Sequence, residues 1–194
     1  VLSKLPSVVR NASRTSRCFA IQSSAKTGCI MLKIMYGDIF KSNAEALVCP
    51  VNLKGVMGAG LALKFDRIFP LYGESYRKAC SDGMLCTEGI HVFVRDAKSN
   101  PEYIISFPTK THWRLPSTQK LINTGLERLT REVGDREISS VAIPALGCGL
   151  GGLPWKDVRE AIREAFQAFS EVAVELYAPF EAAPPEPRRA PCVR

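Results

Sequence analysis

The stretch Ile143-Pro-Ala-Leu-Gly-Cys-Gly-Leu-Gly-Gly-Leu-Pro-Trp155 decides the fold, because it changes character twice within 13 residues. It continues an apolar run from Ser139 that is typical of a buried strand, and it ends where apolar residues at helical spacing begin. Between the two lie four glycines in six residues. At a strand-to-helix turn, free backbone N–H groups and the helix dipole favour an anion, and missing side chains let a ligand approach. The stretch therefore predicts an anion-binding turn.

A second glycine loop, Pro50-Val-Asn-Leu-Lys-Gly-Val-Met-Gly-Ala-Gly60, stands in the same context. It follows a buried apolar run and precedes a segment with helical periodicity. A single loop of this kind is more often just a turn. Two such loops on one sheet are more informative, because open α/β sheets bind ligands at the carboxyl ends of their strands. Together they predict a ligand with a diphosphate and sugars.

Two nucleotide-binding classes are excluded by motif and position. Gly147, Gly149 and Gly152 satisfy G-x-G-x-x-G. A dehydrogenase needs this motif after its first strand, with several strands still to come. Only 42 residues follow Gly152, including a proline-rich tail, so the Rossmann interpretation fails. There is no G-x-x-x-x-G-K-[ST] motif, so a P-loop nucleotidase is unsupported.

The chain between residues 31 and 180 alternates between strand and helix patterns. Strands are predicted at residues 31–36, 44–51, 89–95, 102–107, 139–146 and 172–177. Helices are predicted at residues 61–69 and 71–81, separated by Pro70, at 117–133 with Ser117 as N-cap, and at 155–169. This alternation predicts an α/β fold with helices on both faces of a largely parallel or mixed sheet.

Charge and composition divide the 194 residues into three parts. Residues 1–30 carry five basic residues and no acid, and we expect a disordered basic extension or a transit peptide. Residues 181–194 contain four prolines and are expected to form a disordered tail. Residues 31–180 form the folded domain and hold 18 basic and 17 acidic residues. The sequence pI of about 9.1 is therefore no evidence for a nucleic-acid-binding face.

Cysteine usage and hydropathy limit the other options. The seven cysteines form no C-x-x-C pair and the chain has only two histidines, so no metal site or cofactor is expected. Scattered, odd-numbered thiols are typical of a reducing compartment. We expect a cytoplasmic protein (nuclear if eukaryotic), or a mitochondrial one if residues 1–30 are a transit peptide. No membrane span is expected, since no apolar run approaches about 18 residues. A monomer is expected, because the sequence shows no heptad repeat.

Three segments resemble the macro domain family, in order and across residues 31–178. They are the run from Met31 to Phe40 with Gly37-Asp38-Ile39, Asn52 with the loop Gly55 to Gly60, and the run from Ile143 to Gly152. Phe107-Pro-Thr-Lys110-Thr-His112-Trp113 and the second glycine loop are similar to the DarG-type branch of DNA ADP-ribosyl glycohydrolases. A more distant resemblance is to the terminal ADP-ribose protein glycohydrolase. The resemblance implies a three-layer α/β/α macro domain with a central mixed sheet that binds ADP-ribose.

The resemblance also implies roles for individual residues. Asp38, with the Ile39 backbone nearby, would accept hydrogen bonds from the adenine amino group, and Tyr177 would lie against the adenine. The positions around the distal ribose and the diphosphate would be Asn52, Gly55, Val56, Met57, Gly58, Gly60, Gly147, Cys148, Gly149, Leu150 and Gly151. Thr109 and His112 would lie beside Lys110, where His112 either orients the acceptor or has no catalytic part. Alternatives remain open for three of these positions. Asp38 can cap the following turn, Asn52 can satisfy its own turn, and Tyr177 can be a core aromatic.

Lys110 matches the catalytic lysine of the DarG-type branch. A lysine can act at an anomeric carbon as a Schiff-base nucleophile after ring opening, or its charge can stabilise the departing group. The alternative is a solvated surface lysine. Gly151 stands where the protein-directed glycohydrolase has an acidic residue, which favours the DNA-directed branch.

The resemblance therefore implies a hydrolase that removes ADP-ribose from an ADP-ribosylated substrate, with thymidine in DNA favoured over protein. Two alternatives remain. The first is hydrolysis of carboxylate-linked ADP-ribose on proteins or of O-acetyl-ADP-ribose, and the second is a non-catalytic reader of ADP-ribose.

Overall fold

A six-stranded mixed sheet forms the centre of the computed structural model, which describes residues 31–179 except residue 97. The strands are β1 (Leu32–Met35), β2 (Ala46–Asn52), β3 (His91–Val94), β4 (Tyr103–Lys110), β5 (Ser140–Pro144) and β6 (Ala173–Tyr177). Their order in the sheet is β1-β6-β5-β2-β4-β3. All neighbours are parallel except β3 and β4, which are antiparallel. The predictions for residues 1–30 and 181–194 lie outside the described residues.

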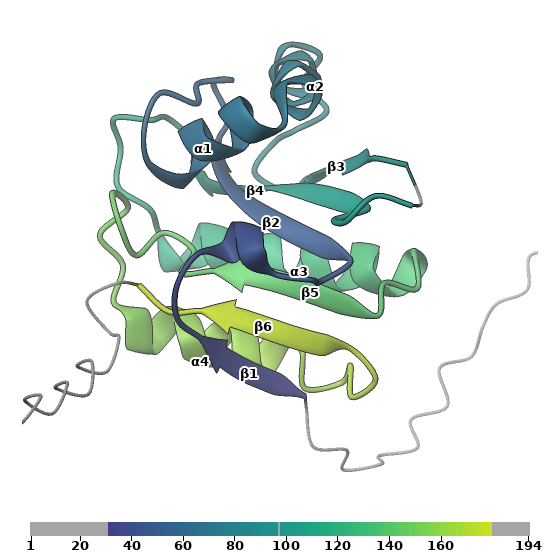
Figure 1. Cartoon of the computed structure of the whole chain (residues 1–194). Coiled ribbons are helices and arrows are strands. Elements are labelled where there is room, and N and C mark those ends of the chain that lie inside the picture. The colour runs from purple at the N-terminus through teal and green to yellow at the C-terminus, as the bar shows by residue number, and fades with distance from the viewer. Residues whose placement is uncertain (1–30, 97, 180–194) are drawn as a thin grey trace, which may run out of the picture.

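Helices cover both faces of this sheet, which confirms the expected three layers (Figure 1). They are α1 (Gly60–Ile68), α2 (Pro70–Ser81), α3 (Gln119–Asp135) and α4 (Trp155–Ala165), with a short 3-10 helix, η1 (Ile39–Lys41). The helices α3 and α4 share one hydrophobic core with the sheet, and α1, α2 and η1 share the other. No helix in the described part of the chain is long and apolar enough to cross a membrane.

The central strand β2 shows how one apolar run supplies both cores. Ala46 and Val48 are fully buried against α3 and α4, whereas Leu47, Cys49 and Val51 pack toward α1 and α2. Successive side chains of a strand point to opposite faces, so a strand covered on both sides must be apolar throughout. This is why residues 44–51 lack the alternation of a half-exposed strand.

Three predicted boundaries were wrong for reasons that the structure explains, and the other bounds differ from the predicted ones by at most two residues. The N-cap of α3 is Thr118, whose hydroxyl accepts a bond from the Leu121 N–H at 3.3 Å, and not Ser117. The helix α4 ends at Ala165 and not at residue 169, because turns with i to i−3 bonds take over after Phe166. The strand β4 continues to Lys110 and passes through Pro108. It does so because β3 pairs only with residues 103–106, and proline is tolerated where a strand has lost one neighbour.

Gly125 lets α3 pack directly on β4. A Cβ at this position would lie within 3.0 Å of three ring atoms of Phe107, whose side chain is fully buried. We expect Gly125→Ala to lower the free energy of unfolding by about 1–3 kcal/mol, the usual cost of overpacking, although alanine favours a helix. Urea denaturation measures the change.

The matched control is Gly134→Ala in the same helix, where a Cβ would meet only Phe169 at an ordinary 3.4 Å. We expect this variant to be as stable as the parent or slightly more stable. Equal losses in the two variants would contradict a specific clash with Phe107.

Candidate functional site

The two glycine loops follow β5 and β2, the neighbouring strands from which the sheet extends in opposite directions. After β2 the chain adds β3 and β4 on one side, and after β5 it adds β6 on the other. Hydrogen-bonded pairing between β2 and β5 is limited to Ala46–Leu47 and Val141–Ala142. Ligands of open α/β sheets bind outside the carboxyl ends of strands at such a switch point. The loops after β2 and β5 both lie on this edge, at the left of Figure 1.

The first loop (residues 53–59) is shaped by the buried side chain of Asn52. Its Oδ1 accepts bonds from the N–H groups of Lys54 at 2.9 Å and Val56 at 3.4 Å, and its Nδ2 donates to the Val56 carbonyl at 2.6 Å. Asn52 therefore does satisfy its own turn, as the alternative interpretation proposed. This bonding also fixes the loop residues that follow it, so the two interpretations are compatible. Gly55 adopts a φ of 71°, a conformation that favours glycine.

The helix α1 opens from this loop with an uncapped N-terminus. Its N-cap residue is Ala59, which makes no side-chain capping bond. The first N–H groups of a helix have no partner within the helix, and here they are those of Gly60, Leu61 and Ala62. Val56, Gly58 and Gly60 are exposed, and Met57 is buried beneath them. The predicted residues of the first loop thus offer backbone amides on an open surface.

The second loop (residues 147–152) presents amide groups in the same region. The chain folds back on itself through bonds from the Gly152 N–H to the Gly149 carbonyl and from the Leu153 N–H to the Gly147 carbonyl, both at 3.0 Å. Within residues 31–179, no acceptor is found for the N–H groups of Gly149, Leu150 and Gly151. Three successive amides without a partner suit a diphosphate.

The two loops are close neighbours. A Cβ built on Gly60 at the start of α1 would lie 3.9 Å from Cδ1 of Leu150 in the second loop. The expectation that turns near Gly58 and Gly149 share one edge of the sheet is met. One ligand can therefore reach the N-terminus of α1 and the second loop at once.

Gly151 is enclosed, and no side chain fits there. A Cβ at this position would lie well inside 3.0 Å of the Gly147 carbonyl oxygen and of the Ser117 Oγ. The Ser117 N–H donates to the Gly151 carbonyl at 3.0 Å, which ties the loop to the start of α3. The Ser117 Oγ is buried and has no hydrogen-bond partner among the described residues. Sequence reasoning took Ser117 for a helix cap and so missed its position beneath this loop.

Lys110 joins the two loops across the switch point. It ends β4 and lies opposite Asn52 in the β2–β4 pairing, just after an irregularity in the register that leaves Thr109 without a partner. Irregularities of this kind often re-aim a side chain near a functional site. The Nζ of Lys110 donates to the Leu150 carbonyl at 2.6 Å. Lys110 is therefore not a freely solvated lysine. Its amine contacts the second loop, and its backbone carbonyl accepts a bond from the Leu53 N–H of the first loop at 3.2 Å.

The predicted adenine end is formed by η1 and the ends of β1 and β6. The Asp38 carboxylate caps η1 by accepting a bond from the Phe40 N–H at 3.2 Å. The side chain is exposed, and its Oδ2 is free to accept a further bond. Ile39 is buried, so only its backbone is available to a ligand. Tyr177 is 6% exposed and belongs to the core, which supports its interpretation as a core aromatic and leaves little of its ring for a ligand.

Thr109 and His112 flank Lys110 but differ in exposure. Thr109 is buried and donates to the Val51 carbonyl at 3.3 Å, so it holds β4 against β2 and offers no side-chain group to a ligand. His112 lies in the loop after β4, where its Nδ1 accepts a bond from the Arg114 N–H at 3.1 Å.

One further residue supports the site from the α2 side. The buried Tyr76 of α2 donates its hydroxyl hydrogen to the Asn52 carbonyl at 2.7 Å.

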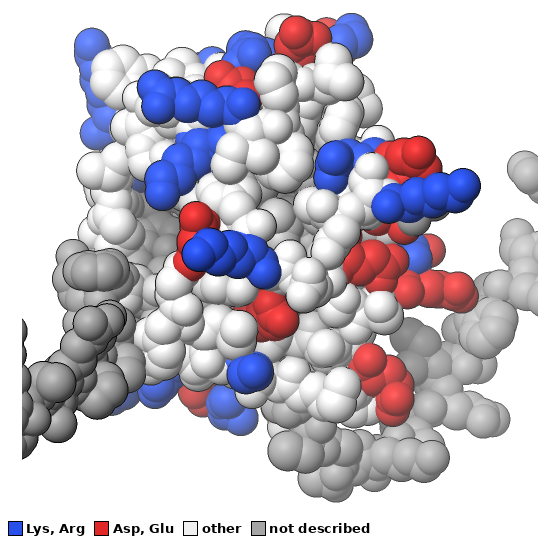
Figure 2. Space-filling model, viewed as in Figure 1, with Lys and Arg blue, Asp and Glu red and all other residues white. Residues whose placement is uncertain are grey.

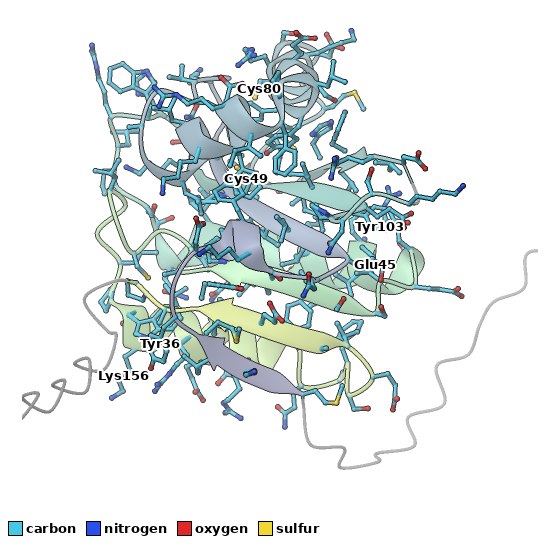
Figure 3. The ribbon with its side chains drawn as sticks, viewed as in Figure 1. Tyr36, Glu45, Cys49, Cys80, Tyr103 and Lys156 are labelled. Atoms are coloured by element: carbon cyan, nitrogen blue, oxygen red, sulfur yellow. The ribbon has the colours of Figure 1, made fainter. Side chains whose placement is uncertain are left out.

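The other edge of the sheet carries structural polar groups. Figure 3 shows Glu45 and Tyr103 at the edge opposite the glycine loops, whereas Tyr36 and Lys156 lie toward the edge where β1 and β6 end. The Glu45 carboxylate accepts bonds from the N–H and hydroxyl of Ser139 at 2.8 and 2.7 Å, which fixes the start of β5. No group of three metal-ligating side chains occurs in the described part of the chain.

Cys148 tests the environment of the second loop. Burial raises the pKa of this half-buried thiol from 9.0 to about 11. At pH 8 its thiolate fraction is therefore about 100-fold lower than that of an ordinary thiol. We expect iodoacetamide to label the exposed Cys86 well before Cys148, and labelling of Cys148 to rise about tenfold per pH unit from pH 8 to 10. Mass spectrometry of tryptic peptides measures both rates, and faster labelling of Cys148 at pH 8 would contradict this environment.

Comparison with known proteins places the same residues in one family. The family model described as "Macro domain" matches residues 48–162. The DNA ADP-ribosyl glycohydrolase of Thermus aquaticus is 42% identical over 151 residues, which cover 78% of this chain and 42% of that protein. This chain thus spans about two fifths of the length of that relative.

Two solved structures agree with this result. The macrodomain of Mycobacterium tuberculosis DarG matches with a TM-score of 0.75 and 41% identity, over 78% of this chain and 99% of that one. A structure described as Thermosipho africanus DarTG in complex with ADP-ribose matches with a TM-score of 0.73 and 32% identity, over 80% of this chain and 43% of that one.

Proposed function

The chain belongs to the macro domain family, and from this premise we propose that it binds ADP-ribose and removes it from thymidine in DNA. The relatives that are most similar among those described are DNA ADP-ribosyl glycohydrolases, and they support this substrate over others. The reaction is a hydrolysis. The bond between the anomeric carbon of the distal ribose and the acceptor breaks, water supplies the hydroxyl group to that carbon, and a proton goes to the acceptor.

One observation carries the proposal: Lys110 contacts both amide-rich loops, the second through its amine and the first through its backbone carbonyl. The free amides of residues 149–151 and the uncapped N-terminus of α1 suit a diphosphate. A lysine bonded to the Leu150 carbonyl at 2.6 Å is then held beside the part of the ligand that follows the diphosphate. In ADP-ribose that part is the distal ribose, whose anomeric carbon is the reacting atom. We therefore assign the catalytic role to Lys110.

Lys110 can assist in two ways, and both use its present position. As a neutral amine it can attack the anomeric carbon of the opened sugar as a Schiff-base nucleophile. Thymidine then leaves with a proton, and water hydrolyses the Schiff base to release ADP-ribose and the free amine. As an ammonium it can stabilise negative charge on the departing group. Either role requires the amine to exchange the Leu150 carbonyl for the substrate. Trapping with borohydride distinguishes the roles, since only the first leaves ADP-ribose bound covalently to the protein.

The space at Gly151 favours a DNA acceptor over a protein acceptor. The protein-directed glycohydrolase that the sequence resembles more distantly carries an acidic residue at this place. Here the Gly147 carbonyl and the Ser117 hydroxyl fill the volume that any side chain would need. The catalytic carboxylate of that branch therefore has no place in this loop. Lys110 is left as the basic side chain that contacts this loop.

The test is a release assay on three substrates. The purified chain is incubated with a single-stranded oligonucleotide that carries one ADP-ribosylated thymidine, with a peptide ADP-ribosylated on glutamate, and with O-acetyl-ADP-ribose. We expect free ADP-ribose and unmodified oligonucleotide as products, at a rate well above those for the other two substrates. Faster release from the peptide or from O-acetyl-ADP-ribose would move the function to protein or metabolite hydrolysis. Saturable ADP-ribose binding by calorimetry with no product from any substrate would make the chain a reader.

A further inference from the structure

A stack of three planar side chains stands exposed in the loop that follows Lys110. The rings of His112 and Trp113 are stacked, with centroids 5.4 Å apart and an interplanar angle of 25°. The guanidinium carbon of Arg114 lies 4.4 Å from the centroid of Trp113. Trp113 nevertheless keeps 45% of its surface exposed, and neighbouring Leu115 keeps 51%. The core does not require this indole, and the proposed hydrolysis has not used it.

Backbone bonds hold this loop in place. The Leu115 N–H donates to the His112 carbonyl at 3.0 Å, and the Arg114 N–H donates to Nδ1 of the His112 ring at 3.1 Å. Two residues later, the Ser117 N–H binds the Gly151 carbonyl of the second glycine loop. An exposed aromatic group on a fixed backbone loses little entropy on binding, so it is suited to contact a partner.

The charge around the stack is basic, although the domain is nearly neutral. Between Glu102 and Glu127 the chain carries Lys110, Arg114 and Lys120 and no acidic residue. On most of the face that Figure 2 shows, basic and acidic side chains are interspersed, and Lys and Arg gather mainly toward its upper left. A broad electrostatic contact with duplex DNA is therefore not favoured by this face, whereas a local contact beside Lys110 is.

The stack is also within reach of the site. Trp113 follows Lys110 by three residues, so their Cα atoms are at most about 11 Å apart. Stacked nucleotides rise by about 3.4 Å each, so this span corresponds to about three nucleotides at most. A base next to the modified thymidine can therefore meet the stack while the distal ribose lies at Lys110.

We propose that the loop of residues 111–115 is a platform on which a nucleobase flanking the modified thymidine of single-stranded DNA stacks, with Trp113 as its main contact. The base takes the place of the exposed Arg114 guanidinium on the Trp113 ring. The inference rests on the proposed function, since it names how the acceptor strand is held. Aromatic rings and guanidinium groups stack on any base, so the platform holds the strand without selecting its sequence.

The test compares substrates of two sizes in Trp113→Ala, Trp113→Phe and the parent. The substrates are ADP-ribosylated thymidine as a mononucleotide and the same nucleotide in the middle of a ten-residue single strand. We expect Trp113→Ala to lower the ratio of kcat/KM for the strand to kcat/KM for the mononucleotide by about 5- to 150-fold, the range for loss of one stacking partner. Trp113→Phe keeps an aromatic face and should retain most of the ratio. Leu71→Ala is the matched control, because Leu71 is 70% exposed on α2, outside the platform.

A binding measurement separates the platform from the reaction. We expect a fluorescein-labelled, unmodified ten-residue thymidine strand to bind Trp113→Ala more weakly than the parent in fluorescence anisotropy at low salt. If the parent hydrolyses both substrates and Trp113→Ala leaves the ratio and the anisotropy unchanged, the platform is wrong and the proposed function stands. If the parent hydrolyses neither substrate, the proposed function itself fails. A selective loss on an ADP-ribosylated peptide, with DNA unaffected, would overturn the platform in favour of a protein partner.

Discussion

Replacement of Lys110 by alanine is expected to reduce ADP-ribose release at least 100-fold while ADP-ribose still binds within a few-fold of the parent affinity. The reduction follows from loss of the group that acts on the departing acceptor or attacks the sugar, and removal of such a group typically lowers kcat by about 100- to 1,000-fold or more. Binding is retained because the amides of residues 149–151 and the N-terminus of α1 supply the phosphate contacts without a lysine side chain.

The measurements are single-turnover release from an ADP-ribosylated oligonucleotide and calorimetric titration with free ADP-ribose. Lys78→Ala is a suitable control, because Lys78 is also a lysine with a bonded amine, paired with Asp82 on the exposed surface of α2. A fully exposed pair of this kind contributes little to stability, so this variant should keep parent activity. Release by Lys110→Ala at the parent rate would remove Lys110 from the mechanism.

Replacement of Gly151 by alanine is expected to abolish both binding and release. The added methyl group would clash with the Gly147 carbonyl oxygen and the Ser117 hydroxyl, so the loop must move. A shifted loop misaligns the three free amides and displaces the Leu150 carbonyl that holds the Lys110 amine. Because the clash is with backbone, removal of the serine hydroxyl in Ser117→Ala should not rescue the variant.

Calorimetry with ADP-ribose and thermal unfolding measure the two consequences. We expect a loss of at least 100-fold in affinity, and a lower Tm that reflects about 1–3 kcal/mol of overpacking. Gly149→Ala is the matched control for folding, since a Cβ at Gly149 meets nothing within 4 Å and should leave the Tm unchanged. Parent-like ADP-ribose affinity in Gly151→Ala would mean that the second loop does not bind the diphosphate.

The sequence predicted the layers and the loops well, because both depend on local patterns. Buried strands, amphipathic helices and glycine-rich turns are each written in fewer than 20 successive residues. The switch point between β2 and β5 could not be predicted in this way, since it depends on strand order and not on any segment. The periodicity left the sheet as parallel or mixed, and the family resemblance pointed to the mixed sheet and to Lys110.

Ser117 and Thr118 show where local reasoning fails. Both residue types cap helices, and nothing in the adjacent sequence says which of them does so. The decision is made by Gly151, 34 residues later, whose carbonyl takes the Ser117 N–H and leaves Thr118 to cap α3. The bond from Lys110 to the Leu150 carbonyl is of the same kind, because its partners are 40 residues apart.

The short backbone pairing between β2 and β5 divides the sheet into two halves. On one side lie β1, β6 and β5, on the other β2, β4 and β3, and only two residue pairs join their backbones. A ligand held by the loop after β2 and the loop after β5 contacts both halves. Ligand binding then raises the free energy of unfolding by RT ln(1 + [L]/Kd), which grows with ligand concentration. Because both halves also share the core beneath α3 and α4, bound ADP-ribose should raise the Tm of the whole domain in a single transition that moves upward with ligand concentration.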